Sequence, residues 1–522
     1  MLQAVKHPSI KEKGVNRLID EVDQLRVSAF QRAELDHRSL LGQYSTPPPI
    51  ATLMASFFKS DRTDVRLLDP GAGVGSLTSA YIARLCNQQK KPKSLQVTAY
   101  EIDPKLKGYL GRSFAICGHA CAKAGISFDG RISGEDFIAS AVALLETTLF
   151  GNDNRKFDAV ILNPPYKKIN SVSEHRRLLR RVGIETSNLY TAFLALSVLL
   201  LDPGGQLVAI TPRSFCNGPY FRPFRQLFLR EMSIRHVHLF ESRTEAFSED
   251  EVLQENIIIH AIKTKQKNQN TNVSTSLGPT DTPSVRVMTP KALVRPNDPQ
   301  QFIHIIANDA GSRATDLMGR LSNSLDDIGL SVSTGPVVDF RCKSCLKAEP
   351  APGSVPLIYP SHFADGWVKW PRLGHKKPNA CLLNDRSRKW LVPSSVYVLT
   401  KRFSAKEEAR RIVAAVFDPD LVQCELVAFE NHLNYFHEKG RGIPMNLAKG
   451  LAVYLNSTVT DTYFRQFNGH TQVNASDLRS LKFPGREELE KLGQLIGDRF
   501  PGSDEIDHLV ESRFPRWLKN RE

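Results

Sequence analysis

The tetrapeptide Asn163-Pro164-Pro165-Tyr166 directly follows the apolar run 158–162 and offers unusual chemistry for the end of a strand. Its prolines fix φ and remove two backbone donors, so neighbouring carbonyl oxygens stay available as acceptors. The Asn163 side-chain oxygen and the Pro164 carbonyl oxygen can each accept one N–H of a planar amine, and the amine nitrogen can then expose a lone pair. Tyr166 offers a stacking face for the ring that carries the amine. Taken alone, the tetrapeptide also fits a rigid turn after a strand.

A glycine-rich turn, DPGAGVG at 69–75, lies between an apolar run and a helical pattern. Its G-x-G-x-G spacing differs from the dinucleotide fingerprint G-x-G-x-x-G. Glu101 ends the next apolar run, where an acid can accept hydrogen bonds from ribose hydroxyls. Asp136 and Phe137 follow a short strand and can meet an adenine amine and its ring. No phosphate-binding lysine motif is present, so the sequence predicts an adenosine ligand without a pyrophosphate.

Short apolar runs that alternate with helical patterns must position these residues. Alternation of this kind predicts an α/β fold with a Rossmann-like, doubly wound parallel sheet that binds ligands at the carboxyl ends of its strands. Strands are expected at 65–69, 95–101, 158–162, 206–211, 236–241 and 256–262, and helices at 10–40, 50–59, from about 75, from about 104 and at 189–201.

The length of 522 residues predicts two or three domains. A helical segment at 1–40 is expected to precede a catalytic domain at 41–270. The stretch 266–284 is rich in Asn, Ser, Thr, Gly and Pro and predicts a linker at 271–285. Beyond it the periodicity weakens, and residues 286–522 are expected to form a mixed α/β domain.

Composition narrows the class of protein. A hydrophobic content of 41% excludes disorder throughout, and no apolar run reaches the ~20 residues needed to cross a bilayer. No secretory signal is visible, and eight scattered cysteines are typical of reduced thiols, so a cytoplasmic protein without a membrane partner is expected. The net charge of +14 is concentrated in 1–240 and 331–482, on either side of an acidic stretch. This pattern favours a polyanion partner, although general solubility charge is the alternative.

Several segments outside the two motifs are candidates for nucleic-acid contact. Basic residues follow the tetrapeptide at Lys167-Lys168 and in the arginine-rich stretch 176–181, where a solvated helix face is the alternative. Mixed basic and aromatic or polar loops occur at 333–341, 367–372, 375–377 and 468–474. Cys342 and Cys345 lack a second pair at short spacing, so no metal site is expected.

The motif order GQYSTP (42–47), DPGAGVG, YEID (100–103), GEDF (134–137) and NPPY resembles the S-adenosylmethionine-dependent N6-adenine DNA methyltransferases of the gamma class. The stretches AITPRSF (209–215) and VLQENII (252–258) are similar to the methylases of PstI/BsuBI-type restriction–modification systems. The resemblance covers roughly residues 40–265. It implies a class I methyltransferase fold and a C-terminal target-recognition domain.

The resemblance also implies roles for single residues. The expected cofactor contacts are Ser45 and Thr46 at the methionine end of S-adenosylmethionine, Asp69, Gly71 and Gly73 along its centre, Glu101 at the ribose, and Asp136 and Phe137 at the adenine.

The expected catalytic turn is Asn163, Pro164, Pro165 and Tyr166, with Tyr166 stacked on a base that has left the duplex. A second stacking aromatic is expected in 211–225, at Phe221 or, as its rival, Tyr220.

The resulting hypothesis is a site-specific DNA adenine-N6 methyltransferase. It would act as a monomer on double-stranded DNA and protect that DNA beside a separately encoded restriction endonuclease. A six-base palindrome such as CTGCAG is the expected target. The alternatives are an NPPY-type methyltransferase acting on RNA adenine or protein glutamine, and a non-catalytic DNA-binding relic.

Overall fold

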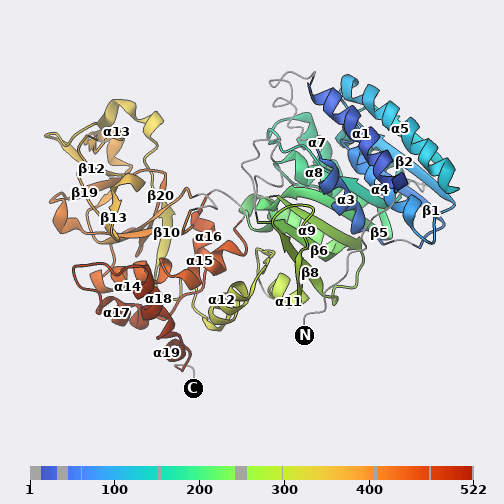
Figure 1. The fold of residues 1–522 in the computed structure, drawn as a ribbon. Coiled ribbons are helices and arrows are strands. Elements are labelled where there is room, and N and C mark those ends of the chain that lie inside the picture. The colour runs from blue at the N-terminus through green and yellow to red at the C-terminus, as the bar shows by residue number, and fades with distance from the viewer. Residues whose placement is uncertain are drawn as a thin grey trace. The chain divides into compact units, whose positions relative to one another are not determined.

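The computed structural model describes residues 13–31, 45–59, 61–150, 156–241, 256–296, 298–374, 376–404, 408–468 and 472–519. The chain divides into two compact units, residues 1–307 and 308–522 (Figure 1). No helix within the described ranges is long and apolar enough to span a bilayer.

A nine-stranded sheet forms the centre of the first unit, in the order β3-β2-β1-β4-β5-β7-β6-β8-β9. Strands β1 to β5 are mutually parallel, and β7 inserts antiparallel between β5 and β6. The predicted doubly wound α/β sheet is thus confirmed. The strands are β1 (Asp64–Pro70), β2 (Ser94–Tyr100), β3 (Ser127–Ser133), β4 (Phe157–Leu162), β5 (Leu201–Pro212), β6 (Met232–Phe240), β7 (Asn256–Lys263), β8 (Thr271–Ser276) and β9 (Ser284–Met288).

Helices cover both faces of this sheet. Successive strand residues point to opposite faces, so Leu67 of β1 packs with one helical layer and Leu68 with the other. The first layer is α1 (Lys13–Gln31), α3 (Pro48–Ser56), α4 (Ser76–Asn87) and α5 (Pro104–Ala124), of which α1, α4 and α5 lie together in Figure 1. The second layer is α6 (Phe137–Phe150), α7 (Glu174–Arg181), α8 (Leu189–Leu200) and α9 (Arg222–Glu231).

Local sequence explains where α5 begins and ends. The Asp103 side chain accepts a hydrogen bond from the Lys105 backbone N–H at 2.8 Å, and Pro104 occupies the first turn, where its missing donor costs nothing. Gly125 ends the helix at φ 76°, a left-handed conformation that favours glycine. The Asp103 cap therefore also holds the end of the segment that carries Glu101.

The predicted linker at 271–285 is wrong, because this stretch contributes β8 and the first residues of β9 to the sheet. Most of the polar side chains of β8 bond to groups on the neighbouring strands. The Ser274 hydroxyl lies 2.6 Å from His236 Nε2 and 2.7 Å from His238 Nδ1. The boundary between the compact units falls after Ala307. Of the predicted helix 10–40, α1 accounts for 13–31, and residues 32–44 lie outside the described ranges.

The second unit is mixed α/β, as predicted. A six-stranded sheet has the order β10-β20-β17-β18-β14-β13, and a five-stranded sheet has the order β11-β15-β12-β19-β16. The strands are β10 (Ser331–Thr334), β11 (Leu346–Lys347), β12 (Ser354–Ile358), β13 (Phe363–Ala364), β14 (Trp367–Val368), β15 (Ala380–Leu382), β16 (Leu391–Pro393), β17 (Tyr397–Lys401), β18 (Ala414–Phe417), β19 (Leu426–Phe429) and β20 (Leu433–His437). Its longer helices are α12 (Asp309–Arg320), α14 (Met445–Leu455), α15 (Thr458–Arg465), α17 (Arg486–Gly493) and α18 (Ser503–Glu511).

Two buried histidines make the stability of the first unit depend on pH. Burial lowers the pKa of His260 to about 3, and nearby cations add to the effect; burial likewise lowers the pKa of His304 to about 3. In the unfolded chain a histidine titrates near 6.5. As the pH falls below that value, the unfolded state takes up protons that the folded state excludes, so stability is full above about pH 6.5 and declines below it.

We expect His260→Gln, which can keep a hydrogen bond to Gln206, to reduce this pH dependence. When the pH falls from 7.5 to 5.5, the free energy of unfolding of the wild type should decrease by about 1 kcal/mol more than that of the variant. Urea unfolding followed by circular dichroism measures this loss. All four tryptophans lie in the second unit, so tryptophan fluorescence is an internal control that the substitution should leave unchanged. Equal pH dependence of wild type and variant would contradict the prediction.

Candidate active site

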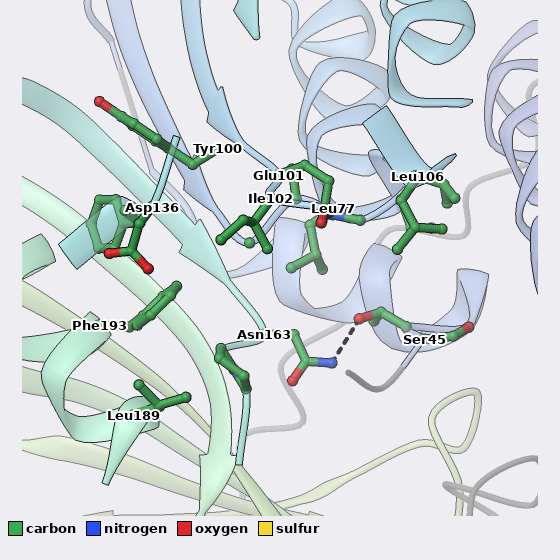
Figure 2. Close-up of a pocket in the computed structure, with 18 of the residues that line it drawn as sticks. Ser45, Leu77, Tyr100, Glu101, Ile102, Leu106, Asp136, Asn163, Leu189 and Phe193 are labelled. Atoms are coloured by element: carbon green, nitrogen blue, oxygen red, sulfur yellow. Dashed lines mark hydrogen bonds between the residues drawn. The ribbon is translucent and has the colours of Figure 1, made fainter. Parts of the chain in front are cut away.

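A cavity of about 280 Å³ lies where β1, β2 and β4 end. Parallel pairing sets these strand ends side by side, with Pro70 opposite Tyr100 and Leu67 opposite Ala159. Figure 2 shows Asp136 and Phe193 on one side of the cavity, Ser45 on the other, and Glu101 and Ile102 between them. The predicted site residues that line it are Ser45, Thr46, Gly71, Gly73, Glu101, Asp136, Phe137, Asn163 and Pro165.

The Glu101 carboxylate holds the glycine turn in place. Its Oε2 accepts the Gly73 backbone N–H at 2.8 Å, and its Oε1 accepts the Asp103 N–H at 2.8 Å. Gly73 has φ 58°, and no atom lies within 4 Å of the position where its Cβ would be. A side chain there would be strained and would project into open space beside the cavity. The turn thus presents bare backbone to a ligand.

Asp69 lies beneath the glycine turn rather than on the cavity wall. It is fully buried, and its Oδ2 accepts a hydrogen bond from the Thr78 hydroxyl of α4 at 2.6 Å. Its pKa is raised to about 7, chiefly by burial; the Thr78 hydrogen bond opposes this shift and the charge of Glu101 adds to it. Its Oδ1 has no hydrogen-bond partner among the described residues. Asp69 therefore ties the turn to α4, and its contact with a cofactor stays a prediction.

Asp136 and aromatic residues form one end of the cavity. Asp136 Oδ2 lies 3.0 Å from His175 Nε2, and its Oδ1 accepts the Ala139 N–H at 3.0 Å. Burial opposes ionisation of Asp136, but these hydrogen bonds prevail and lower its pKa, while Asp136 raises the pKa of His175. The Phe137 ring lies 4.9 Å from that of Phe193. A carboxylate beside apolar rings suits a flat heterocycle with an exocyclic amine.

Asn163 lies directly after β4 and is oriented by two side chains. Its Nδ2 donates to Thr46 Oγ1 at 3.1 Å, the bond marked by the dashed line in Figure 2. Its Oδ1 accepts the Tyr166 hydroxyl at 3.1 Å. Both partners are hydroxyl groups, which can donate or accept; in this arrangement Nδ2 faces Thr46, which is only 8% exposed, and Oδ1 is the acceptor. This polarity is the one that binding of an amine requires.

The two candidates for the second stacking aromatic differ in exposure. Phe221 is 6% exposed and packs with its ring centre 5.6 Å from that of Tyr190, whereas Tyr220 is 78% exposed. The fully buried Arg225 holds this segment by donating to the carbonyls of Phe215 and Gly218 at 2.9 and 2.8 Å. Phe221 must leave its packing to reach a ligand, and Tyr220 need not.

The arginine-rich stretch 176–181 is partly neutralised by ion pairs with glutamates. Arg176 and Arg180 pair with Glu185, and Arg181 pairs with Glu146. Arg177 is exposed and has no ion pair among the described residues.

In the second unit, two of the predicted loops contact each other and a third lies against residue 402. The Asp339 carboxylate lies 3.2 Å from Lys377 Nζ, which joins 333–341 to 375–377. The Val473 N–H donates to the Arg402 carbonyl at 2.7 Å, and the Phe403 and His432 rings lie 4.8 Å apart. His375 and residues 469–471 lie outside the described ranges.

The tryptophans at 367–372 serve packing instead. Trp367 lies against Phe500, and the Trp370 indole N–H donates to the Asn379 carbonyl at 2.7 Å. Across the described ranges, no three His, Cys, Asp or Glu side chains are grouped so that they could hold a metal ion.

Comparison with known proteins decides the family. Residues 122–247 match the family model described as Eco57I restriction-modification methylase. The chain is 46% identical over 503 residues to the type II methyltransferase M.BsuBI of Bacillus subtilis, covering 95% of this chain and 98% of that protein. It is 43% identical over 490 residues to the type II methyltransferase M.PstI of Providencia stuartii, covering 94% and 96%. The chain belongs to the type II methyltransferases of restriction–modification systems.

The family resemblance drawn from the motifs is thus confirmed. Among solved structures, the type IIL restriction–modification enzyme MmeI in complex with DNA matches this type II methyltransferase at a TM-score of 0.51 and 11% identity. The match covers 97% of this chain and 74% of MmeI, and it supports the fold.

Sequence reasoning missed several residues that line the cavity of the methyltransferase, among them Arg26, His175 and Phe193. They lie on α1, α7 and α8, away from any motif. His175 directly precedes the arginine-rich stretch 176–181, and Phe193 lies in the expected helix at 189–201. Only the tertiary structure brings them to Asp136 and Phe137.

The bond between Thr46 and Asn163 predicts a specific split between rate and binding. Thr46→Val keeps the shape but removes the acceptor for Asn163 Nδ2, so the amide loses its fixed orientation. We expect kcat for methyl transfer to fall about 3- to 10-fold, the value of one hydrogen bond, while KM for DNA changes little. Thr46→Ser keeps the hydroxyl and should retain most of the rate. Steady-state kinetics on all three proteins test this, and a wild-type kcat for Thr46→Val would refute it.

Proposed function

We propose that this type II methyltransferase transfers a methyl group from S-adenosylmethionine to the N6 amine of an adenine flipped out of duplex DNA. We further propose that it protects its target site from a separately encoded restriction endonuclease and acts as a monomer. The observation that carries the proposal is the Asn163 amide, which is held by Thr46 at the end of β4 and faces the same cavity as Glu101 and Asp136.

The residues around the cavity fit the cofactor. Glu101 and Asp136 offer carboxylates for ribose hydroxyls and an adenine amine, and Phe137 and Phe193 offer apolar faces. The bare turn at Gly73 adds a cradle for the cofactor, and Asp69 holds that turn from beneath. When bound, S-adenosylmethionine supplies an activated methyl group on a positively charged sulfur. Its amino-acid end would lie toward Ser45 and Thr46.

The catalytic turn prepares the substrate amine. Asn163 Oδ1 and the Pro164 carbonyl oxygen would each accept one N–H of the flipped adenine, which draws its nitrogen toward sp³ geometry and frees the lone pair. Tyr166 would stack on the base, a contribution of ~1–3 kcal/mol against an extrusion cost of a few kcal/mol. Neither a nucleophilic side chain nor a metal is required, because the attacking atom belongs to the substrate. Fixed alignment of the two reactants would contribute most of the rate.

The second unit supports DNA as the substrate. Its clustered loops carry Arg402, Lys377 and the exposed rings of Phe340 and Phe403, which are 65% and 43% exposed. Cations of this kind position phosphates, and side chains between them read base edges. A unit of this size suits duplex recognition better than recognition of a free amide.

Asn163→Ala should abolish methyl transfer while DNA binding persists. Loss of one pre-organised acceptor costs about 10²- to 10³-fold in rate. The assay is transfer of labelled methyl groups into unmethylated DNA that contains CTGCAG among other sites, followed by nucleoside mass spectrometry. Asn170→Ala, in the exposed segment that follows the turn, is the matched control and should keep the wild-type rate.

The product identifies the reaction. N6-methyladenine at a discrete set of sites would establish the proposal and reveal the target sequence. Label in RNA or protein instead would favour the alternative substrates, and absence of both transfer and cofactor binding would favour a DNA-binding relic. Transfer by Asn163→Ala at the wild-type rate would refute the role of the amide.

The exposures of Tyr220 and Phe221 favour Tyr220 as the second stacking ring. We expect Tyr220→Ala to lower the fluorescence gain of 2-aminopurine placed at the target adenine and to weaken binding of flipped DNA about 10-fold, while Tyr220→Phe behaves as wild type. Phe221→Leu keeps an apolar core side chain and should retain the signal. If Phe221→Leu loses the signal and Tyr220→Ala keeps it, the stacking ring is Phe221, as the motif resemblance implied.

A further inference from the structure

A buried arginine of the N-terminal helix lines the cofactor cavity. Arg26 lies near the C-terminal end of α1 and is 5% exposed, although it carries a permanent charge. The helix is anchored by Leu18 and Val22, which pack in the same core as α3 and α4. The position of Arg26 is therefore set by the packing of α1 in the core.

The contacts of Arg26 lead to the catalytic amide. Its Nε donates to Asp23 Oδ1 at 2.6 Å, and its Nη1 donates to Ser45 Oγ at 2.8 Å. Thr46, the next residue, accepts the hydrogen bond from Asn163. A buried guanidinium is therefore placed at the end of the cavity opposite Asp136, where Figure 2 shows Ser45.

The charged residues that line the cavity include Asp136 and Arg26, which lie toward opposite ends, with Glu101 between them. At one end Asp136 is paired with His175, and this end suits the adenine. At the other end Arg26 donates a hydrogen bond to Ser45, the residue before Thr46. The cofactor has a single anionic group, the carboxylate of its methionine part, at the end remote from the adenine. The planar fork of an arginine matches a carboxylate better than a lysine does, because it can donate two parallel hydrogen bonds.

We propose that Arg26 binds the carboxylate of the methionine part of S-adenosylmethionine, so that α1 belongs to the cofactor site. This inference rests on the proposed function. Asp23 fixes the guanidinium through Nε, and Ser45 fixes it through Nη1. Because Ser45 adjoins Thr46, occupation of this end also restrains the segment that orients Asn163.

A ligand cycle tests the inference without measuring turnover. Calorimetry gives the affinities of wild type and Arg26→Gln for S-adenosylhomocysteine and for S-adenosyl-3-thiopropylamine, the same molecule without its carboxylate. We expect the wild type to prefer the carboxylate-bearing ligand by about 10- to 100-fold, the value of hydrogen bonds between charged groups, and Arg26→Gln to lose that preference. Arg26→Lys keeps the charge and should recover part of it.

Arg17→Gln is the matched control, because Arg17 lies on the same helix with its side chain 79% exposed and paired with Glu21. It should bind both ligands as the wild type does, and thermal unfolding of each variant verifies that α1 remains packed. Equal weakening of both ligands by Arg26→Gln, or no weakening of either, would overturn the role of Arg26 alone. Failure of the wild type to bind either ligand would overturn the proposed cofactor, and the inference with it.

Discussion

The parallel register of β1, β2 and β4 is the constraint on which the site depends. Neighbouring strands end at the same sheet edge, so residues far apart in the sequence arrive together once that register is set. The core enforces it, because a slip by one residue would turn Leu67 and Leu68 to the wrong helical layers. Glu101 then joins two of these strand ends by binding the Gly73 and Asp103 N–H groups. The geometry around Glu101 and the glycine turn is thus a consequence of core packing.

The strands were predictable where apolar runs end in residues that cannot continue them. The expected strands at 65–69, 95–101 and 158–162 agree with β1, β2 and β4 to within one or two residues. β8 was missed because Asn, Ser and Thr dominate it. A stretch of such residues is typical of a loop. In the sheet, the Ser274 hydroxyl of β8 is paired with His236 and His238 of the neighbouring strand β6, which the sequence pattern does not reveal. The strand β5 was expected to begin at residue 206, because Asp202-Pro203-Gly204-Gly205 has the composition of a turn. In the structure it begins at Leu201.

The residues of the site were predictable from the sequence where they belong to motifs. The residues that end strands were identified from type and spacing, and most of them line one cavity. Arg26 and His175 were not, because their meaning comes from partners 19 and 39 residues away, Ser45 and Asp136. A lone arginine or histidine in a polar helix carries no signal of the cavity that it faces. Motifs thus reveal the chemistry at strand ends, whereas side chains on covering helices need the tertiary structure.

Tyr166 shows how the base-free site is held ready for its proposed substrate. Its hydroxyl occupies Asn163 Oδ1, and its ring meets Tyr190 edge-on at 6.3 Å. A flipped adenine that takes the place of this hydroxyl would exchange one hydrogen bond for another, which is nearly neutral in free energy. The gain must therefore come from stacking, at ~1–3 kcal/mol per ring, against an extrusion cost of a few kcal/mol. One ring at this value offsets only part of that cost, and the proposed second stacking ring would offset most of the remainder.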